Sequence, residues 1–142
     1  MKRNASAVWT GALKEGRGII STDSGVLSDT QYSFGTRFEN GKGTNPEELI
    51  AAAHAGCFSM ALSAQLGTMG LTPDRIATSA SVSLEKVGDG FAITAVHLTV
   101  KAKVPGADAP QFQTAANNAK AGCPVSKVLN ATITMDATLE QQ

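Results

Sequence analysis

The sequence lacks most of the features that mark the specialised classes of protein. Its 142 residues include only two cysteines, too few for a disulfide framework. Twelve basic residues offset twelve acidic ones, and this zero net charge argues against nucleic acid or an anionic membrane as a partner. No apolar run follows the first three residues as in a signal peptide, and no stretch approaches the roughly 18 apolar residues of a membrane span. We therefore expect a cytoplasmic protein.

Several motifs of cofactor and metal chemistry are also missing. The chain has no phosphate-binding loop, no Gly-x-Ser-x-Gly elbow and no dinucleotide fingerprint. Its only histidines are His54 and His97, and no Cys-x-x-Cys or His-x-x-x-His pair offers the close spacing of zinc ligands. We expect neither a metal nor a bound cofactor. In a reducing compartment, paired thiols are more often redox-active or merely buried than structural.

The most informative segment that is present covers residues 44–70, which we predict to form one long helix. Asn45 is the expected N-cap, because a residue before proline avoids the helical region and Pro46 suits the first helical position. Glu48, three residues after Asn45, would complete a capping box. Apolar residues occur on all sides over 49–66, so the helix is expected to be buried on most sides.

The rest of the chain shows the alternating apolar and polar residues of strands, separated by turn residues. We predict strands over 5–10, 19–22, 32–39, 76–86, 91–104 and 131–139, and helices over 110–121 and 124–129. A shift in the apolar phase predicts a β-bulge near Ala95. Because strands and helices are segregated along the chain, the fold class is α+β with antiparallel sheet, in a single domain over 1–142.

Two cysteines lie in the predicted helical segments. Cys57 alone is typical of a small core residue, although His54, three residues earlier on the same face, could favour its thiolate. A lone histidine on an apolar helix is itself more often a core group. Cys123 precedes Pro124 and is expected at the start of a short helix, where free amides lower the pKa of a thiol. If the helices pack together, the two thiols can meet and cycle with a disulfide.

Arg37 and Glu47 are further candidates, although an arginine on a strand is usually a solvated charge and a glutamate in a first helical turn usually complements the helix dipole. Glu47 lies ten residues before Cys57 on the same helix, about 15 Å away along the axis and on a different face. A shared site would therefore need the helix of a second subunit, or an arginine long enough to bridge.

Four segments together resemble one known family. The segments are 36–39 (TRFE), 43–49 (GTNPEEL), 52–62 (AAHAGCFSMAL) and 119–126 (AKAGCPVS). They resemble the OsmC family, which includes osmotically inducible proteins and organic hydroperoxide resistance proteins. The likeness covers nearly the whole chain, and the two cysteine motifs occur in the family's order.

The resemblance implies an OsmC-like fold, in which antiparallel sheets surround two central helices of an intertwined homodimer. It implies a thiol-dependent peroxidase that reduces organic hydroperoxides, and hydrogen peroxide less well, and that is regenerated by a dithiol reductant. Cys57 matches the peroxide-attacking cysteine, and Cys123 matches the cysteine that resolves its sulfenic acid to a disulfide. Arg37 and Glu47 match the residues that orient the thiolate, with Arg17 as a rival for the arginine.

Two alternatives and one substrate feature accompany this interpretation. The protein could instead be a non-enzymatic apolar-ligand or interaction protein, or a cysteine hydrolase that uses Cys57 and His54 without an evident third member. Candidate residues for an apolar substrate wall are Phe34, Phe38, Phe58 and Met60.

Overall fold

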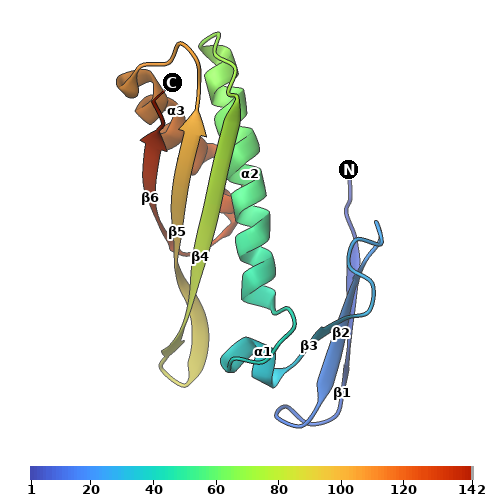
Figure 1. Ribbon diagram of the computed structural model, residues 1–142. Helices are drawn as coiled ribbons and strands as arrows, with labels where there is room; N and C mark the ends of the chain where they lie inside the picture. The colour runs from blue at the N-terminus through green and yellow to red at the C-terminus, as the bar shows by residue number, and fades with distance from the viewer. Residues whose placement is uncertain (142) are drawn as a thin grey trace. The chain divides into compact units, whose positions relative to one another are not determined.

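The structure is a computed structural model that describes residues 1–141 and contains two compact units, Met1–Leu49 and Ile50–Gln142 (Figure 1). The long helix α2 (Pro46–Thr68) starts in the first unit and continues through the second.

A small antiparallel sheet forms the first unit. Its strands β1 (Ala5–Thr10), β2 (Arg17–Thr22) and β3 (Thr30–Tyr32) lie in the order β1-β2-β3. The rings of Trp9 and Tyr32 pack 5.6 Å apart, and a Cβ at Gly18 would collide with both of them. A glycine in β2 therefore lets these two aromatic side chains meet across the sheet.

The predicted strand over 32–39 is wrong. The chain there forms a short helix, α1 (Phe34–Phe38), which is capped by Ser33 and Thr36 in a reciprocal capping box. Phe34 and Phe38 are four residues apart, so they share a face in a helix as well as in a strand. Their rings lie 4.9 Å apart. The alternation therefore fitted both structures, and the local hydrogen bonds of Ser33 decided for the helix.

The predicted limits of α2 are confirmed in their main features. The side chain of Asn45 accepts a hydrogen bond from the amide of Glu48 at 2.8 Å, as an N-cap does. The carboxylate of Glu48 accepts from Thr44 Oγ1 at 3.2 Å, which replaces the return bond of a capping box. At the other end Gly70 has a φ of +74°, and the amide of Leu71 bonds the carbonyl of Leu66.

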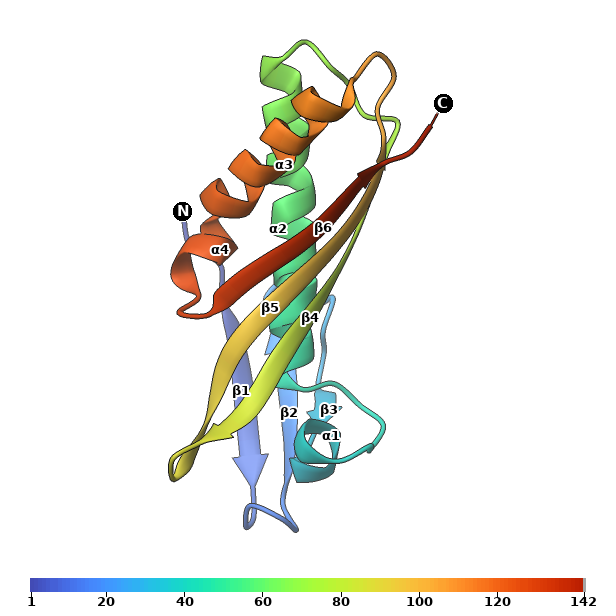
Figure 2. The same ribbon diagram turned by 90° about the vertical axis from the view of Figure 1, so that its left-hand side faces the viewer.

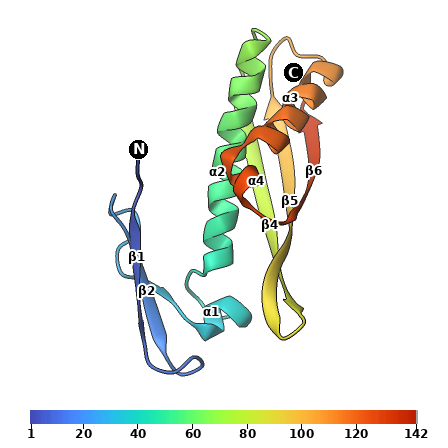
Figure 3. The ribbon, with the colours of Figure 1, turned by 180° about the vertical axis from the view of Figure 1, so that it is seen from behind.

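The second unit packs helices on one face of a three-stranded sheet. Strands β4 (Arg75–Val87), β5 (Gly90–Lys103) and β6 (Thr132–Leu139) lie in the order β4-β5-β6. Helices α2 and α3 (Ala109–Gly122) cover the same face, and the short α4 (Pro124–Val128) follows α3 (Figures 2 and 3). The register of β4 and β5 shifts where Ser83 pairs with Ala95 and Leu84 with Ile93, which confirms the predicted bulge.

The α+β class is confirmed, with one correction to the expectation of antiparallel sheet. Strands β4 and β5 are antiparallel, but β5 and β6 are parallel. The physical reason is the connection: α3 and α4 carry the chain back along the sheet before β6 begins. The strand prediction identified β6 without revealing its direction.

The core of the second unit joins three elements. Side chains at four-residue spacing on α2 meet alternate side chains of β5 and one face of α3. The fully buried members from α2 and β5 include Phe58, Leu62, Leu66, Val96, Leu98 and Val100. This packing holds α2 and the α3–α4 segment on the same sheet face.

The outer face of α2 departs from the expected burial. Met60 is 77% exposed, and a row of small residues on the same helix is exposed as well, including Ala53, Gly56 and Ala64. By length and composition alone, the 23-residue helix α2 is long and apolar enough to cross a membrane. The expectation that no stretch approaches a membrane span is therefore wrong by this criterion, although a core helix passes the same test.

Candidate active site

The two cysteines meet inside the second unit. Cys57 lies in the middle of α2 and is half-buried, whereas Cys123 is fully buried between α3 and α4. Both are free thiols, and their sulfur atoms share a hydrogen bond at 2.7 Å. A disulfide bond of about 2.0 Å could thus form with a small movement of the sulfurs. The expectation that the thiols meet if the helices pack together is confirmed.

The local backbone conformation fixes the position of Cys123 between α3 and α4. Its amide bonds the carbonyl of Ala119 and ends α3, while its backbone leaves the helical region at a ψ of 128°. Pro124 favours this extended conformation in the residue before it and then takes the first position of α4. Cys123 is therefore the N-cap of α4, as predicted, and it lies beside the free amides of that helix.

The surroundings of the two sulfurs perturb them in opposite directions. Burial raises the pKa of Cys123, but hydrogen bonds from Cys57, from the amides of Ser126 and Val125, and from the Ser126 hydroxyl outweigh it, so the pKa is lowered. Burial raises the pKa of Cys57, the bond with Cys123 raises it further, and the Val125 amide only partly compensates. Within one chain, the hydrogen bonds therefore favour a thiolate on Cys123.

Arg37 and Glu47 form a second pair, in the first unit. Arg37 Nε and Nη2 donate to the two carboxylate oxygens of Glu47 at 2.9 and 3.1 Å, a bidentate geometry. The Glu47 side chain is 10% exposed and the Arg37 side chain is 39% exposed. The guanidinium also lies over the Phe38 ring, 5.3 Å from its centroid. Arg17 is exposed in β2.

The four candidate residues therefore form two pairs, one within each unit. The sequence left open whether Glu47 acts in its own chain, and the ion pair shows that its carboxylate binds an arginine of the same chain. Sequence spacing did not reveal that Arg37 and Glu47 pair within one chain, because the ion pair depends on helix α1, which was not predicted.

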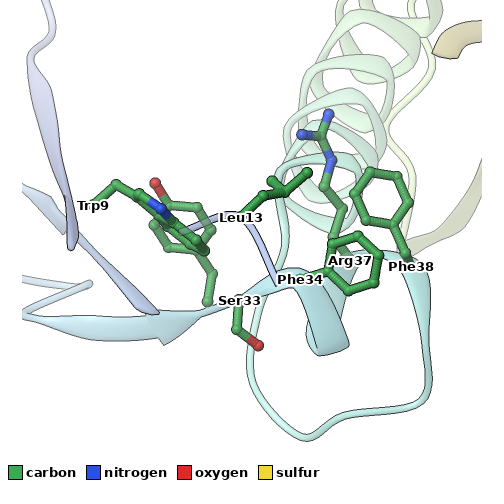
Figure 4. A pocket seen from close by; sticks show the side chains of 7 residues that line it. Trp9, Leu13, Ser33, Phe34, Arg37 and Phe38 are labelled. Carbon is green, nitrogen blue, oxygen red and sulfur yellow. The ribbon is translucent and has the colours of Figure 1, made fainter. Parts of the chain in front are cut away.

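An apolar pocket of about 260 Å³ opens beside Arg37 in the first unit (Figure 4). Aromatic side chains dominate its lining, which consists of Trp9, Leu13, Tyr32, Ser33, Phe34, Arg37 and Phe38. Phe34 and Phe38 were expected in such a wall, whereas Trp9 and Tyr32 were missed because their contact depends on strand pairing. Phe58 is fully buried in the core and Met60 is on the outer face of α2, so neither lines this pocket.

His54 contacts a residue that the sequence did not single out. Its Nε2 lies 2.8 Å from Ser126 Oγ. Among the hydrogen bonds of residues 1–141, none joins the His54 ring to the sulfur of Cys57 or Cys123. Burial lowers the pKa of His54, so the ring is neutral at pH 7. The only available signal for Ser126 was its position three residues after Cys123, one turn into α4.

No group of three or more metal-ligating side chains gathers anywhere in residues 1–141. The second histidine, His97, lies on β5 and contacts Thr134 Oγ1 at 2.6 Å and Asp136 Oδ2 at 3.1 Å.

Comparison with known proteins places these features in a wider group. The family model described as OsmC-like protein matches residues 39–138. The chain is 56% identical to "Peroxiredoxin OsmC" of Escherichia coli K12 over 138 residues, 97% of this chain and 96% of that one. It is 32% identical to the organic hydroperoxide resistance protein of Xanthomonas axonopodis pv. citri over 136 residues, 95% of this chain and 92% of that one.

Solved structures agree on the fold. The crystal structure of the organic hydroperoxide resistance protein OhrB of Bacillus subtilis has a TM-score of 0.71 at 28% identity, over 95% of this chain and 98% of that one. An OsmC-like protein from Mycoplasma pneumoniae has a TM-score of 0.75 at 16% identity, over 99% of both chains, a likeness of fold alone.

Proposed function

The chain belongs to the OsmC-like protein family, and from this membership we propose that it is a cysteine-based peroxidase that reduces organic hydroperoxides, and hydrogen peroxide less well. The observation that carries the proposal is the pair of free thiols with sulfurs 2.7 Å apart. Relatives named as a peroxiredoxin and as hydroperoxide resistance proteins support the same reaction.

The proposed reaction begins with the Cys57 thiolate, which attacks the distal oxygen of the hydroperoxide. The O–O bond breaks, the organic oxygen leaves as an alcohol after taking up a proton, and Cys57 becomes a sulfenic acid. The Cys123 thiolate then attacks this sulfur, so the S–S bond forms and hydroxide leaves and is protonated to water. An external dithiol reduces the disulfide and restores both thiols.

Arg37 has a specific task in this scheme. Because burial and the hydrogen bond with Cys123 raise the pKa of Cys57, a further positive charge is needed to hold its thiolate. We assign that charge to Arg37, held by two hydrogen bonds from its guanidinium to Glu47. The guanidinium also stabilises the negative charge that develops on the leaving oxygen. The neighbouring apolar pocket suits the organic part of the substrate.

We also propose that the working protein is a homodimer and that each chain forms a single domain over residues 1–142. The exposed, small-residue face of α2 supports this, because a second copy of the helix would cover Met60 and its neighbours. Such a dimer would supply the central pair of helices that the family resemblance implies. A dithiol reductant and a cytoplasmic location complete the proposal.

The test is mass spectrometry of both cysteines after one equivalent of an organic hydroperoxide. Wild type should lose two thiols and gain one Cys57–Cys123 disulfide, while Cys123→Ser should accumulate sulfenic acid on Cys57. The Cys57→Ser variant should show no turnover, and substantial peroxidase activity in it would overturn the assignment. An apolar-ligand protein with structural cysteines would show no fast-reacting thiol in any of these samples.

A further inference from the structure

A buried polar pair lies beside the two sulfurs and bridges the same two helices. His54 is fully buried, Ser126 is 8% exposed, and His54 Nε2 lies 2.8 Å from Ser126 Oγ. His54 precedes Cys57 by three residues in α2, and Ser126 follows Cys123 by three residues at the start of α4. The histidine–serine contact and the sulfur–sulfur contact therefore span one junction between α2 and α4.

Packing alone gives no reason for a histidine at this position. The ring is desolvated, and His54 Nδ1 has no hydrogen-bond partner among the described residues. An apolar side chain would fill the same space without an unsatisfied nitrogen. The feature that a histidine adds is the contact of its other nitrogen with Ser126.

Ser126 connects this histidine to Cys123. It lies three residues after Cys123 in the same short helix, and its hydroxyl and its amide are among the hydrogen-bonding groups that lower the pKa of the Cys123 thiol. A serine hydroxyl carries a single proton, so it can donate to only one neighbour at a time. If His54 Nε2 carries a proton and donates it to Ser126 Oγ, the hydroxyl proton remains available for the sulfur.

Resting on the proposed peroxidase function, we propose that His54 is a positioning residue for the resolving step. The Nε2–H tautomer of His54 donates to Ser126 Oγ and directs the hydroxyl proton to Cys123 Sγ, which keeps Cys123 as a thiolate. That thiolate attacks the sulfur of the Cys57 sulfenic acid, where the S–S bond forms and the S–O bond breaks. The Cys123 sulfur is oxidised, the Cys57 sulfur is reduced, and the departing hydroxide takes a proton from solvent.

The groups that titrate around this pair are few. Burial is the cause that lowers the His54 pKa, and the titratable groups at this junction are the thiols of Cys57 and Cys123, with the charged side chain of Lys127 next to Ser126 on α4. Because burial lowers the pKa of His54 below its ordinary value of about 6.5, the ring is neutral at pH 7 and above. A pH dependence of the resolving step therefore reports the thiols and not the histidine.

The test is a single-turnover measurement from pH 5 to 9, with a sulfenic-acid trap and mass spectrometry. Ser126→Ala and His54→Leu should slow disulfide formation about tenfold at pH 7, the effect expected for one lost hydrogen bond to a charged group, and move the midpoint of its pH profile upward. Formation of the Cys57 sulfenic acid should keep its wild-type rate. His54→Gln, whose amide can donate in place of Nε2, should retain most of the resolving rate.

A matched control is available on the same helix. Ser59→Ala removes a half-buried hydroxyl that hydrogen-bonds Thr78 Oγ1 at 2.7 Å, and it should leave the resolving step unchanged. If Ser59→Ala and Ser126→Ala slow that step equally, the effect is structural and the inference is overturned.

Two outcomes distinguish a failure of this inference from a failure of the proposed function. If Cys123→Ser forms no sulfenic acid on Cys57 after hydroperoxide treatment, the peroxidase proposal itself fails. If sulfenic acid forms but His54→Leu resolves it with the wild-type rate and pH profile, only the role of His54 fails. Alkylation of Cys123 in a Cys57→Ser background gives the same comparison without peroxide, and an unchanged Cys123 pKa in His54→Leu would also overturn it.

Discussion

Oxidation of the two thiols should stabilise the folded protein by an amount that follows from their positions. Cys57 and Cys123 are 66 residues apart in sequence, so a disulfide between them closes a long loop in the unfolded chain. The loss of unfolded-chain entropy for a loop of this length corresponds to about 4 kcal/mol at 25 °C. The sulfurs already lie 2.7 Å apart, so the bond requires little displacement of α2 from α4 and little native-state strain offsets the gain.

The measurement is urea unfolding of the fully reduced and the peroxide-oxidised protein at one protein concentration, because an oligomer would make the midpoint concentration-dependent. Mass spectrometry should first confirm complete disulfide formation. The Cys57→Ser and Cys123→Ser variants, treated with the same peroxide, should show no gain in the free energy of unfolding. A fully formed disulfide that leaves the wild type equally stable, or less stable, would refute the idea that the folded chain holds these sulfurs ready to bond.

Three other predictions concern single side chains. Glu47→Gln removes the charge that holds Arg37 and should lower kcat/KM for an organic hydroperoxide about tenfold, whereas Glu48→Gln should leave it unchanged; equal effects would contradict the proposed role. Leu62→Ala should lower the free energy of unfolding by about 3 kcal/mol in urea, since Leu62 is fully buried, and a loss below about 1 kcal/mol would contradict its place in the core. His54 has a folded-state pKa below its ordinary value of about 6.5, so the unfolded chain binds the extra proton and stability falls as pH drops below that value. His54→Gln should flatten this acid limb of the stability profile, and an unaltered limb would show that His54 does not titrate on unfolding.

Local rules predicted much of the fold. The N-cap at Asn45, the end of α2 near Gly70 and the bulge opposite Ser83 all depend on residues within a few positions of one another. The α1 segment shows where such rules are ambiguous, because Phe34 and Phe38 satisfy the spacing of a helix and of a strand. The direction of β6 was beyond them, because it depends on the path of the connecting helices.

The same distinction between local rules and tertiary structure applies to the candidate site. The amino-acid sequence by itself determined which residues are candidates for the chemistry, since two cysteines in helical segments and the family motifs around them single out Cys57 and Cys123. Tertiary structure alone decided that the two sulfurs touch, that Glu47 holds Arg37, and that His54 reaches Ser126, which lies 72 residues away in sequence. Helical periodicity and capping act over a single turn of chain, whereas these contacts exist only after α2 and the α3–α4 segment have buried their apolar faces against the same sheet, and after α1 has folded beside the start of α2.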